Sequence, residues 1–319
     1  MTDQAEPFDV LTIGRVGVDV YPLQTGVGLE DVDTFGKFLG GSATNVAVAA
    51  ARHGRRAAVI TRTGQDPFGR YVHRALRDLG VSDRFVTAVP GLPTPVTFCE
   101  IFPPDHFPIW FYRYPKAPDL EISPDELPAD DIRRAGLFWS TVTGLCAEPS
   151  RSAHFAAWEA RGRKPATVLD LDYRPSFWDS GQQAAEQVRK ALPQVTVVVG
   201  NLDECDVAVG TRDAARAASA LLDAGAELAV VKRGPDGVLA RTRDAEVRVP
   251  PIRVDVVNGL GAGDGFGGAL CHGLLAGWPL EAVMAFANAA GAIVTTRLEC
   301  SSAMPTTAEV EDLLRAGHA

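Results

Sequence analysis

The most distinctive chemical pattern in the chain is a glycine-rich run that begins at Asn258 and ends in an acid, Asp264. Gly261, Ala262 and Gly263 precede this Asp, and the small residues after it predict a helix that starts there. Glycines let backbone N–H groups converge on one point, and at a helix N-terminus such groups make an anion site. A carboxylate among these amides suits phosphoryl transfer, because it can take a proton from a hydroxyl while the amides stabilise negative charge. The alternative is a helix start in which the Asp serves turn geometry alone.

A second glycine pair, Gly40 and Gly41, lies early in the chain. An extended segment at 34–39 precedes it, and an alanine-rich helix is expected from 44 to 53. Strand, glycines and helix in this order predict a backbone hinge with room for a ligand beside it.

The elements that must position these motifs alternate along the chain. Short apolar strands are expected at 8–13, 59–63, 136–140, 166–170, 195–200 and 228–232, and helices at 66–79, 151–161, 181–192 and 213–224. Strands separated by helix-length segments predict an α/β fold with a mostly parallel central sheet, in which ligands bind beyond the carboxyl ends of the strands.

The domain organisation follows from length and from one unusual stretch. The chain has 319 residues, and we expect one domain over 1–319. Between 94 and 114 the sequence is rich in aromatics and prolines and predicts a hairpin, with strands at 96–102 and 108–114. We expect segments around 15–39 and 94–116 to form a small β lid inserted in the domain.

Composition excludes several classes of protein. The formal net charge is −9, which disfavours nucleic-acid and membrane partners. The five cysteines form no CxxC pair, which favours reduced thiols in the cytoplasm. No signal peptide and no membrane-spanning segment is expected. The spacing of Gly14 and Gly17 does not fit a dinucleotide-binding motif.

The two glycine motifs together resemble the signatures of the ribokinase or PfkB family of carbohydrate kinases. The Gly-Ala-Gly-Asp run at 261–264 resembles one signature, and the run from Gly40 to Asn45 resembles the other, in the order and separation of that family. The resemblance covers nearly the whole chain. It implies a ribokinase-like three-layer α/β/α domain, ATP and Mg²⁺ as cofactors, and a homodimer formed through the lid.

The resemblance also implies a role for each matching residue. Asp264 matches the catalytic base and the three residues before it match the anion hole. The sugar-contacting residues that it implies are Asp19, Gly40, Gly41 and Asn45. An Asp at position 19 could instead only stabilise a turn.

Three further motifs match the nucleotide and metal side of the family's site. Asn201 and Glu204 resemble the pair that organises magnesium and phosphates through water, although a helix start with acids would look the same. The nucleotide-binding residues implied are Lys232, Gly234, Gly237 and Asn288. The glycine turn could be an ordinary β-turn, and the Asn an ordinary helix contact.

One position departs from the family. Many members carry an Asp six residues before the catalytic base, where it helps to form a monovalent cation site. Asn258 stands there in this chain, so the sequence leaves the monovalent cation open.

Two arginines bear on the identity of the acceptor. Arg113 lies in the lid stretch, and Arg174 lies just beyond a predicted strand. Two guanidinium groups near one pocket favour an acceptor with a carboxylate, because the guanidinium fork matches that group. A surface salt bridge for Arg113 and a phosphate contact for Arg174 are the alternatives.

The stretches 14–22, 116–119, 172–178 and 301–305 resemble the branch of the family that phosphorylates 5-dehydro-2-deoxygluconate in inositol catabolism. They are also similar to 2-keto-3-deoxygluconate kinases. A kinase for a neutral sugar such as fructose or ribose, and a catalytically silent ligand-binding protein on the same scaffold, are the remaining hypotheses.

Overall fold

The short apolar strands predicted from the sequence form the middle of a large sheet. The computed structural model describes residues 6–317, and within them ten strands pair into one sheet in the order β14-β13-β12-β11-β10-β9-β1-β4-β5, with β6 also paired to β4. The parallel strands are β1 (Val10–Ile13), β4 (Ala57–Gly64), β5 (Val81–Ser82), β6 (Val86–Val89), β9 (Leu137–Thr141), β10 (Thr167–Asp170), β11 (Val197–Asn201) and β12 (Leu228–Lys232). At one edge β13 (Val238–Arg241) and β14 (Glu246–Val249) pair antiparallel. The predicted mostly parallel sheet is confirmed.

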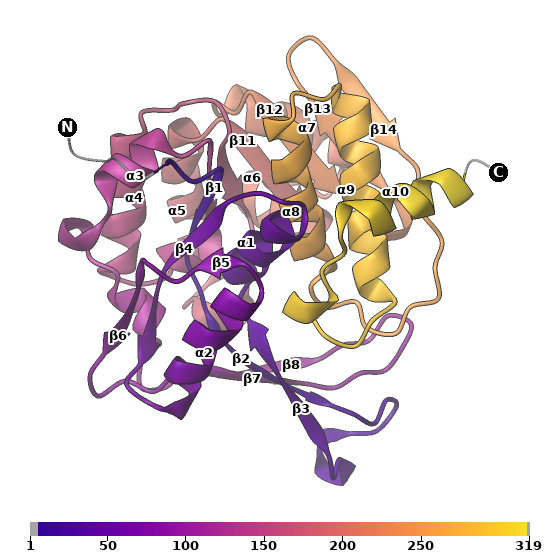
Figure 1. Ribbon diagram of the computed structural model, residues 1–319. Helices are drawn as coiled ribbons and strands as arrows, with labels where there is room; N and C mark the ends of the chain where they lie inside the picture. The colour runs from indigo at the N-terminus through magenta and orange to yellow at the C-terminus, as the bar shows by residue number, and fades with distance from the viewer. Residues whose placement is uncertain (1–5, 318–319) are drawn as a thin grey trace.

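Alternate residues of the central strands pack into two separate cores, one on each face of the sheet. In β11, Val197 and Val199 belong to one core and Val198 to the other. The first core includes side chains from α1 (Ser42–Arg52), α2 (Pro67–Asp78), α8 (Ala262–Leu275), α9 (Leu280–Thr295) and α10 (Thr307–Ala316). The second includes side chains from α3 (Ala129–Arg134), α4 (Ser150–Arg161), α5 (Gly181–Ala191), α6 (Leu202–Val209) and α7 (Ala214–Asp223). Helices therefore cover both faces, which gives three layers (Figure 1).

A second, four-stranded sheet stands off the lower side of this body in Figure 1. Its order is β3-β2-β7-β8, from β2 (Gly17–Pro22), β3 (Phe35–Gly40), β7 (Val96–Cys99) and β8 (Ile109–Tyr112). These strands come from the two segments in which a lid was expected, and the hairpin of β7 and β8 is antiparallel as predicted. We call it the small sheet.

Some elements were not predicted. β2 follows β1 after only three residues, and β13 and β14 lie in a stretch for which the sequence suggested no regular structure. No helix within residues 6–317 is long and apolar enough to cross a bilayer.

Candidate active site

The polar residues singled out in the sequence gather at the carboxyl edge of the parallel sheet. The chain leaves β1 at Gly14, β10 at Asp170, β11 at Asn201 and β12 at Lys232 on this edge, as parallel pairing requires. The N-termini of α1 and α8 meet there, because side chains from the first turns of both helices form hydrogen bonds with one another. Ligands of open α/β sheets bind at this edge.

Asp264 lies in the first turn of α8 and is held by two residues of α1. Its Oδ1 accepts a hydrogen bond from Ser42 Oγ at 2.8 Å, and its Oδ2 accepts one from Asn45 Nδ2 at 2.8 Å. Asn45 is fixed in turn, since its Oδ1 accepts a hydrogen bond from Ser301 Oγ at 2.5 Å. Burial raises the pKa of the Asp264 carboxyl, and the negative charge of Asp172 raises it further. Each carboxylate oxygen keeps acceptor capacity for a further hydrogen bond, as a general base requires.

The turn before Asp264 presents backbone amides without partners. Gly261 has a φ of 82°, in the left-handed region, and caps the N-terminus of α8. Among residues 6–317 no hydrogen bond is found for the amides of Gly261, Ala262 and Gly263. A Cβ atom on Gly263 would lie 3.2 Å from Lys232 Nζ, so this ammonium group stands against the same turn. The arrangement can hold an anion next to Asp264.

The early glycines allow a close approach between β2, β3 and α1. A Cβ atom on Gly40 would overlap the Asp19 carboxylate, and one on Gly41, whose φ is 108°, would overlap the backbone carbonyl of Arg15. Asp19 accepts a hydrogen bond from Tyr21 Oη at 2.9 Å. Burial raises the pKa of Asp19 to about 6. Both glycines are therefore needed to bring Asp19 and the start of α1 together.

A small cavity in front of Asp264 brings together most of the residues expected to contact the acceptor. Its lining includes Asp19, Gly41, Asn45, Arg174 and Asp264. Ile109 and Phe111 of β8 close it from the side of the small sheet, and Arg15, which the sequence analysis had not selected, lines it too. The cavity measures about 50 Å³, room for only a few water molecules.

The predicted arginine of the lid does not line this cavity. Arg113 Nη2 donates a hydrogen bond to Asp119 Oδ2 at 2.9 Å, and its guanidinium lies over the ring of Phe177 at 4.6 Å from the centroid. Arg174 forms an ion pair with Asp172 at 2.8 Å and does reach the cavity.

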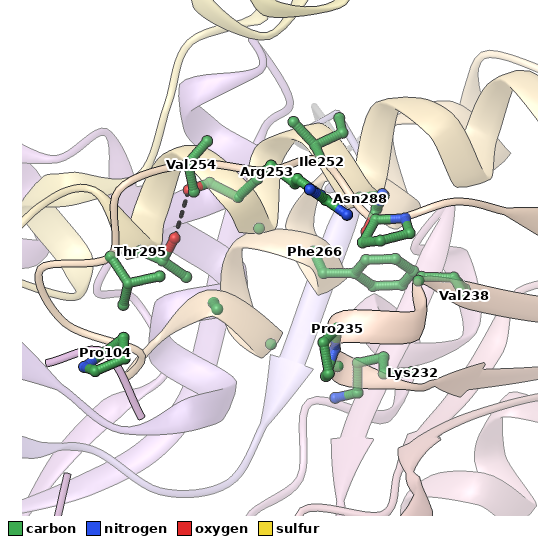
Figure 2. A pocket seen from close by; sticks show the side chains of 18 of the residues that line it. Pro104, Lys232, Pro235, Val238, Ile252, Arg253, Val254, Phe266, Asn288 and Thr295 are labelled. Atoms are coloured by element: carbon green, nitrogen blue, oxygen red, sulfur yellow. Dashed lines mark hydrogen bonds between the residues drawn. The ribbon is translucent and has the colours of Figure 1, made fainter. Parts of the chain in front are cut away.

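A larger pocket of about 810 Å³ adjoins the other side of the anion-binding turn. Lys232, Gly234, Gly237 and Asn288 line it, together with Ala262 and Gly263. Figure 2 shows Lys232 at one end and Ile252, Arg253 and Asn288 at the other. The amide of this Asn donates to the backbone carbonyl of Pro250 at 2.9 Å. Burial lowers the pKa of Lys232, but Asp170 and Glu204 outweigh this and raise it above its ordinary value, so the ammonium stays charged.

Asn201 and Glu204 form a capping box at the start of α6. This is the helix-start alternative to a magnesium-organising pair. The Glu204 amide donates to Asn201 Oδ1 at 2.9 Å, and the Asn201 amide donates to Glu204 Oε2 at 2.7 Å. Neither residue lines the two cavities. Glu204 Oε1 has no hydrogen-bond partner in the described part of the chain, so one carboxylate oxygen remains available. Within residues 6–317 no group of three or more His, Cys, Asp or Glu could hold a metal ion.

The Asn258 side chain forms two hydrogen bonds within the protein. This residue is completely buried, its Nδ2 donates to the Leu298 carbonyl at 2.7 Å, and its Oδ1 accepts from the Leu260 amide at 3.0 Å. An N–H group of Asn258 thus points at the Leu298 carbonyl.

Comparison with known proteins identifies the family. The family model described as pfkB family carbohydrate kinase matches residues 8–307. The chain belongs to the pfkB family. It is therefore a carbohydrate kinase, a phosphotransferase that acts on a sugar hydroxyl, and the expected family is confirmed.

Individual relatives refine the comparison. This kinase is 34% identical to the 5-dehydro-2-deoxygluconokinase of Geobacillus kaustophilus, over 98% of this chain and 95% of that protein. A crystal structure of a putative ribokinase II from E. coli superposes with a TM-score of 0.88 at 21% identity, over 97% and 99% of the two chains, which confirms the ribokinase-like fold. A fructokinase double mutant from Vibrio cholerae, in its fructose, ADP and potassium ion bound form, gives a TM-score of 0.85 at 25% identity, over 98% and 100% of the chains.

Proposed function

We propose that this kinase transfers the γ-phosphoryl group of ATP to a hydroxyl of a sugar acid, and that the acceptor is 5-dehydro-2-deoxygluconate. The observation that carries the proposal is a cavity in which Asp264 and an anion-binding helix start face two guanidinium groups, those of Arg15 and Arg174. A neutral sugar has no use for two cations, whereas a carboxylate does. Relatives that match nearly the whole chain bear the name of the 5-dehydro-2-deoxygluconate kinase.

In the proposed reaction Asp264 takes the proton of the acceptor hydroxyl. The hydroxyl oxygen then forms a bond to the γ-phosphorus while the bond from that phosphorus to the oxygen of departing ADP breaks. Gly261, Ala262 and Gly263 offer amides to the migrating phosphoryl group, and Lys232 adds a positive charge beside them. Ser42 and Asn45 hold the carboxylate of Asp264 in place.

ATP would occupy the larger pocket, with its phosphates toward Lys232 and its base toward Asn288. Gly234 and Gly237, at the turn after β12, bring backbone against it. Magnesium, when bound with the nucleotide, supplies neutralisation of phosphate charge, and the free oxygen of Glu204 can hold one of its waters.

An acceptor panel tests the proposed substrate. ADP release is measured with 5-dehydro-2-deoxygluconate, 2-keto-3-deoxygluconate, fructose and ribose. We expect the highest kcat/KM with the first acid, at least about tenfold above the second and about 100-fold above the neutral sugars, the range that one or two lost polar contacts produce. A neutral sugar as the best acceptor would contradict the proposal.

We predict that the activity does not require potassium. Because Asn258 already donates to the Leu298 carbonyl, replacing K⁺ by tetramethylammonium should change kcat/KM less than about twofold. In Asn258→Asp a buried carboxylate would face that carbonyl, so activity should fall and recover at least about tenfold when K⁺ is added. Strong stimulation of the wild type by K⁺ would refute this prediction.

We also propose that the kinase is a cytoplasmic homodimer formed through the small sheet. The five cysteines are unpaired, which fits a reducing compartment. Along β8, Ile109 and Phe111 face the acceptor cavity, whereas Trp110 and Tyr112 are 41% and 62% exposed on the opposite face. An exposed aromatic sheet face of this kind favours a protein partner, and a second copy carries the same surface.

Sedimentation tests the dimer. We expect a dimer at micromolar concentration for the wild type, and a monomer for Tyr112→Glu with Trp110→Glu, because two buried charges without partners would oppose association. Glu30→Gln, an exposed change outside the strands, is the control and should remain dimeric. A wild type that sediments only as a monomer would exclude the proposed interface.

A further inference from the structure

Arg15 is a buried arginine whose backbone is fixed by its neighbours. It follows β1 directly and is only 8% exposed. Its carbonyl accepts a hydrogen bond from Thr44 Oγ1 at 3.0 Å and lies where any side chain on Gly41 would overlap it. The guanidinium lies 5.2 Å from the centroid of the Phe111 ring. The large domain therefore sets the position of Arg15, and the small sheet covers its charged group.

The guanidinium of Arg15 lacks an ionic partner. Among residues 6–317 no carboxylate lies within 4.0 Å of it, and its Nε is buried with no hydrogen-bond partner. The nearby carboxylates are already engaged, since Asp172 pairs with Arg174 and Asp19 accepts from Tyr21. Burial accordingly lowers the pKa of Arg15. Burying a charge without an ion-pair partner is unfavourable, so the site favours an anion supplied by a ligand.

We infer that Arg15 binds the carboxylate of the acceptor and is the residue that makes this kinase select acids over neutral sugars. The inference rests on the proposed function, because it names the anchor for the acid in the same cavity. Arg15, Arg174 and Asp264 all line that cavity. The acceptor would place its carboxylate at the two guanidinium groups and its reacting hydroxyl at Asp264, with Asp19 free to accept from another hydroxyl.

Arg15 fits this role better than Arg113. The charge of Arg113 is already balanced by Asp119, and both side chains are buried, at 10% and 4% exposure. Arg174 is already paired with Asp172, so we assign it the second contact to the carboxylate of the acceptor. Of the three arginines, only Arg15 has no carboxylate within 4.0 Å among residues 6–317.

The test compares wild type with Arg15→Gln, Arg15→Lys and Arg113→Gln, with Arg216→Gln as a matched control. Arg216 is exposed on α7 and lines neither cavity. The acceptors are 5-dehydro-2-deoxygluconate and fructose. We expect Arg15→Gln to lower kcat/KM for the acid about 100-fold, mainly through a higher KM. The kcat/KM of the same variant for fructose should stay within about threefold of the wild-type value. Arg15→Lys should recover about tenfold of the loss, because it keeps the charge without the fork.

Thermal unfolding separates a binding role from a structural one. Removing an unpaired buried charge should leave the melting temperature of ligand-free Arg15→Gln equal to or above that of wild type. The same variant should lose the rise in melting temperature that the acid produces in wild type. A drop in the ligand-free melting temperature, with acid and fructose affected equally, would overturn the inference.

The outcomes distinguish this inference from the proposed function. If wild type binds the acid without turning it over and Arg15→Gln does not bind it, the inference holds and the proposed function fails. If Arg15→Gln phosphorylates the acid as well as wild type does, or if Arg113→Gln alone shows the acid-specific loss, the inference is overturned while the proposed function stands.

Discussion

Replacing Asp264 by Asn is expected to lower kcat at least about 1,000-fold while the dissociation constant for ATP changes less than about threefold. Positioned general bases contribute about 10²–10⁴-fold to rate, and this carboxylate is the one that stands beside the unpartnered amides. The nucleotide pocket is lined by other residues of the same helix, Ala262, Gly263 and Phe266, which the substitution does not touch. Single-turnover kinetics, with nucleotide affinity measured by calorimetry, separates the two effects.

The matched control for this change is Ser42→Ala. It removes the hydrogen bond to Oδ1 and leaves the carboxylate and its contact with Asn45 in place. We expect a fall in kcat of less than about tenfold, since one orienting hydrogen bond is lost and the base remains. If Asp264→Asn keeps its kcat within tenfold of the wild type, another group accepts the proton and the proposed mechanism is wrong.

The fold was largely predictable because its elements repeat one pattern. Strands such as Val197–Asn201 are short, apolar and flanked by helix-length segments, so local sequence indicates both their type and their parallel pairing. β13 and β14 could not be predicted in the same way. They pair antiparallel at the edge, and the alternation of Glu246 and Arg248 with two valines in β14 is a strand pattern only four residues long.

The site residues were predictable where a motif constrains the backbone. They were less predictable where the role of a side chain depends on which charged group it pairs with. Gly41 and Gly261 adopt positive φ values that other residues disfavour, so the glycines themselves mark the turns. Whether an arginine is free depends instead on which carboxylates fold against it. Asp119 lies six residues after Arg113 and forms an ion pair with it. Nothing in the local sequence around Arg15 indicates that Arg15 has no such partner.

The same limitation applies to Asn201 and Glu204. Asn-x-x-Glu at a helix start satisfies the helix amides by itself, and the structure shows that it does so. The motif therefore predicts a capped helix start, which needs no ligand. A role at magnesium depends on Glu204 Oε1, the one carboxylate oxygen that the cap does not use. Asp264 differs, because its side-chain hydrogen-bond partners come from α1, 222 and 219 residues away in sequence, and not from its own helix.

Replacing Gly261 by Ala is expected to give the second large effect, a fall in kcat of about 100- to 1,000-fold. At a φ of 82° an alanine costs roughly 1–2 kcal/mol, so the turn should relax and move the amides of Ala262 and Gly263 away from the phosphoryl group. The added Cβ would also lie 2.8 Å from Cys300 Sγ, tighter than packing permits. Kinetics of the variant, together with its melting temperature, measure the combined result.

A second substitution resolves the two causes. The added Cβ would also lie 3.0 Å from Cys300 Cβ, so Gly261→Ala is combined with Cys300→Gly, which removes both side-chain atoms and leaves the strained backbone at 261 in place. The double variant is compared with Cys300→Gly alone. If backbone conformation controls the amides, the double variant should recover no more than about tenfold in kcat. Full recovery would mean that the contact with the Cys300 side chain, and not the left-handed turn, sets the geometry of the anion site. An unchanged kcat in Gly261→Ala itself would show that these amides do not stabilise the migrating phosphoryl group.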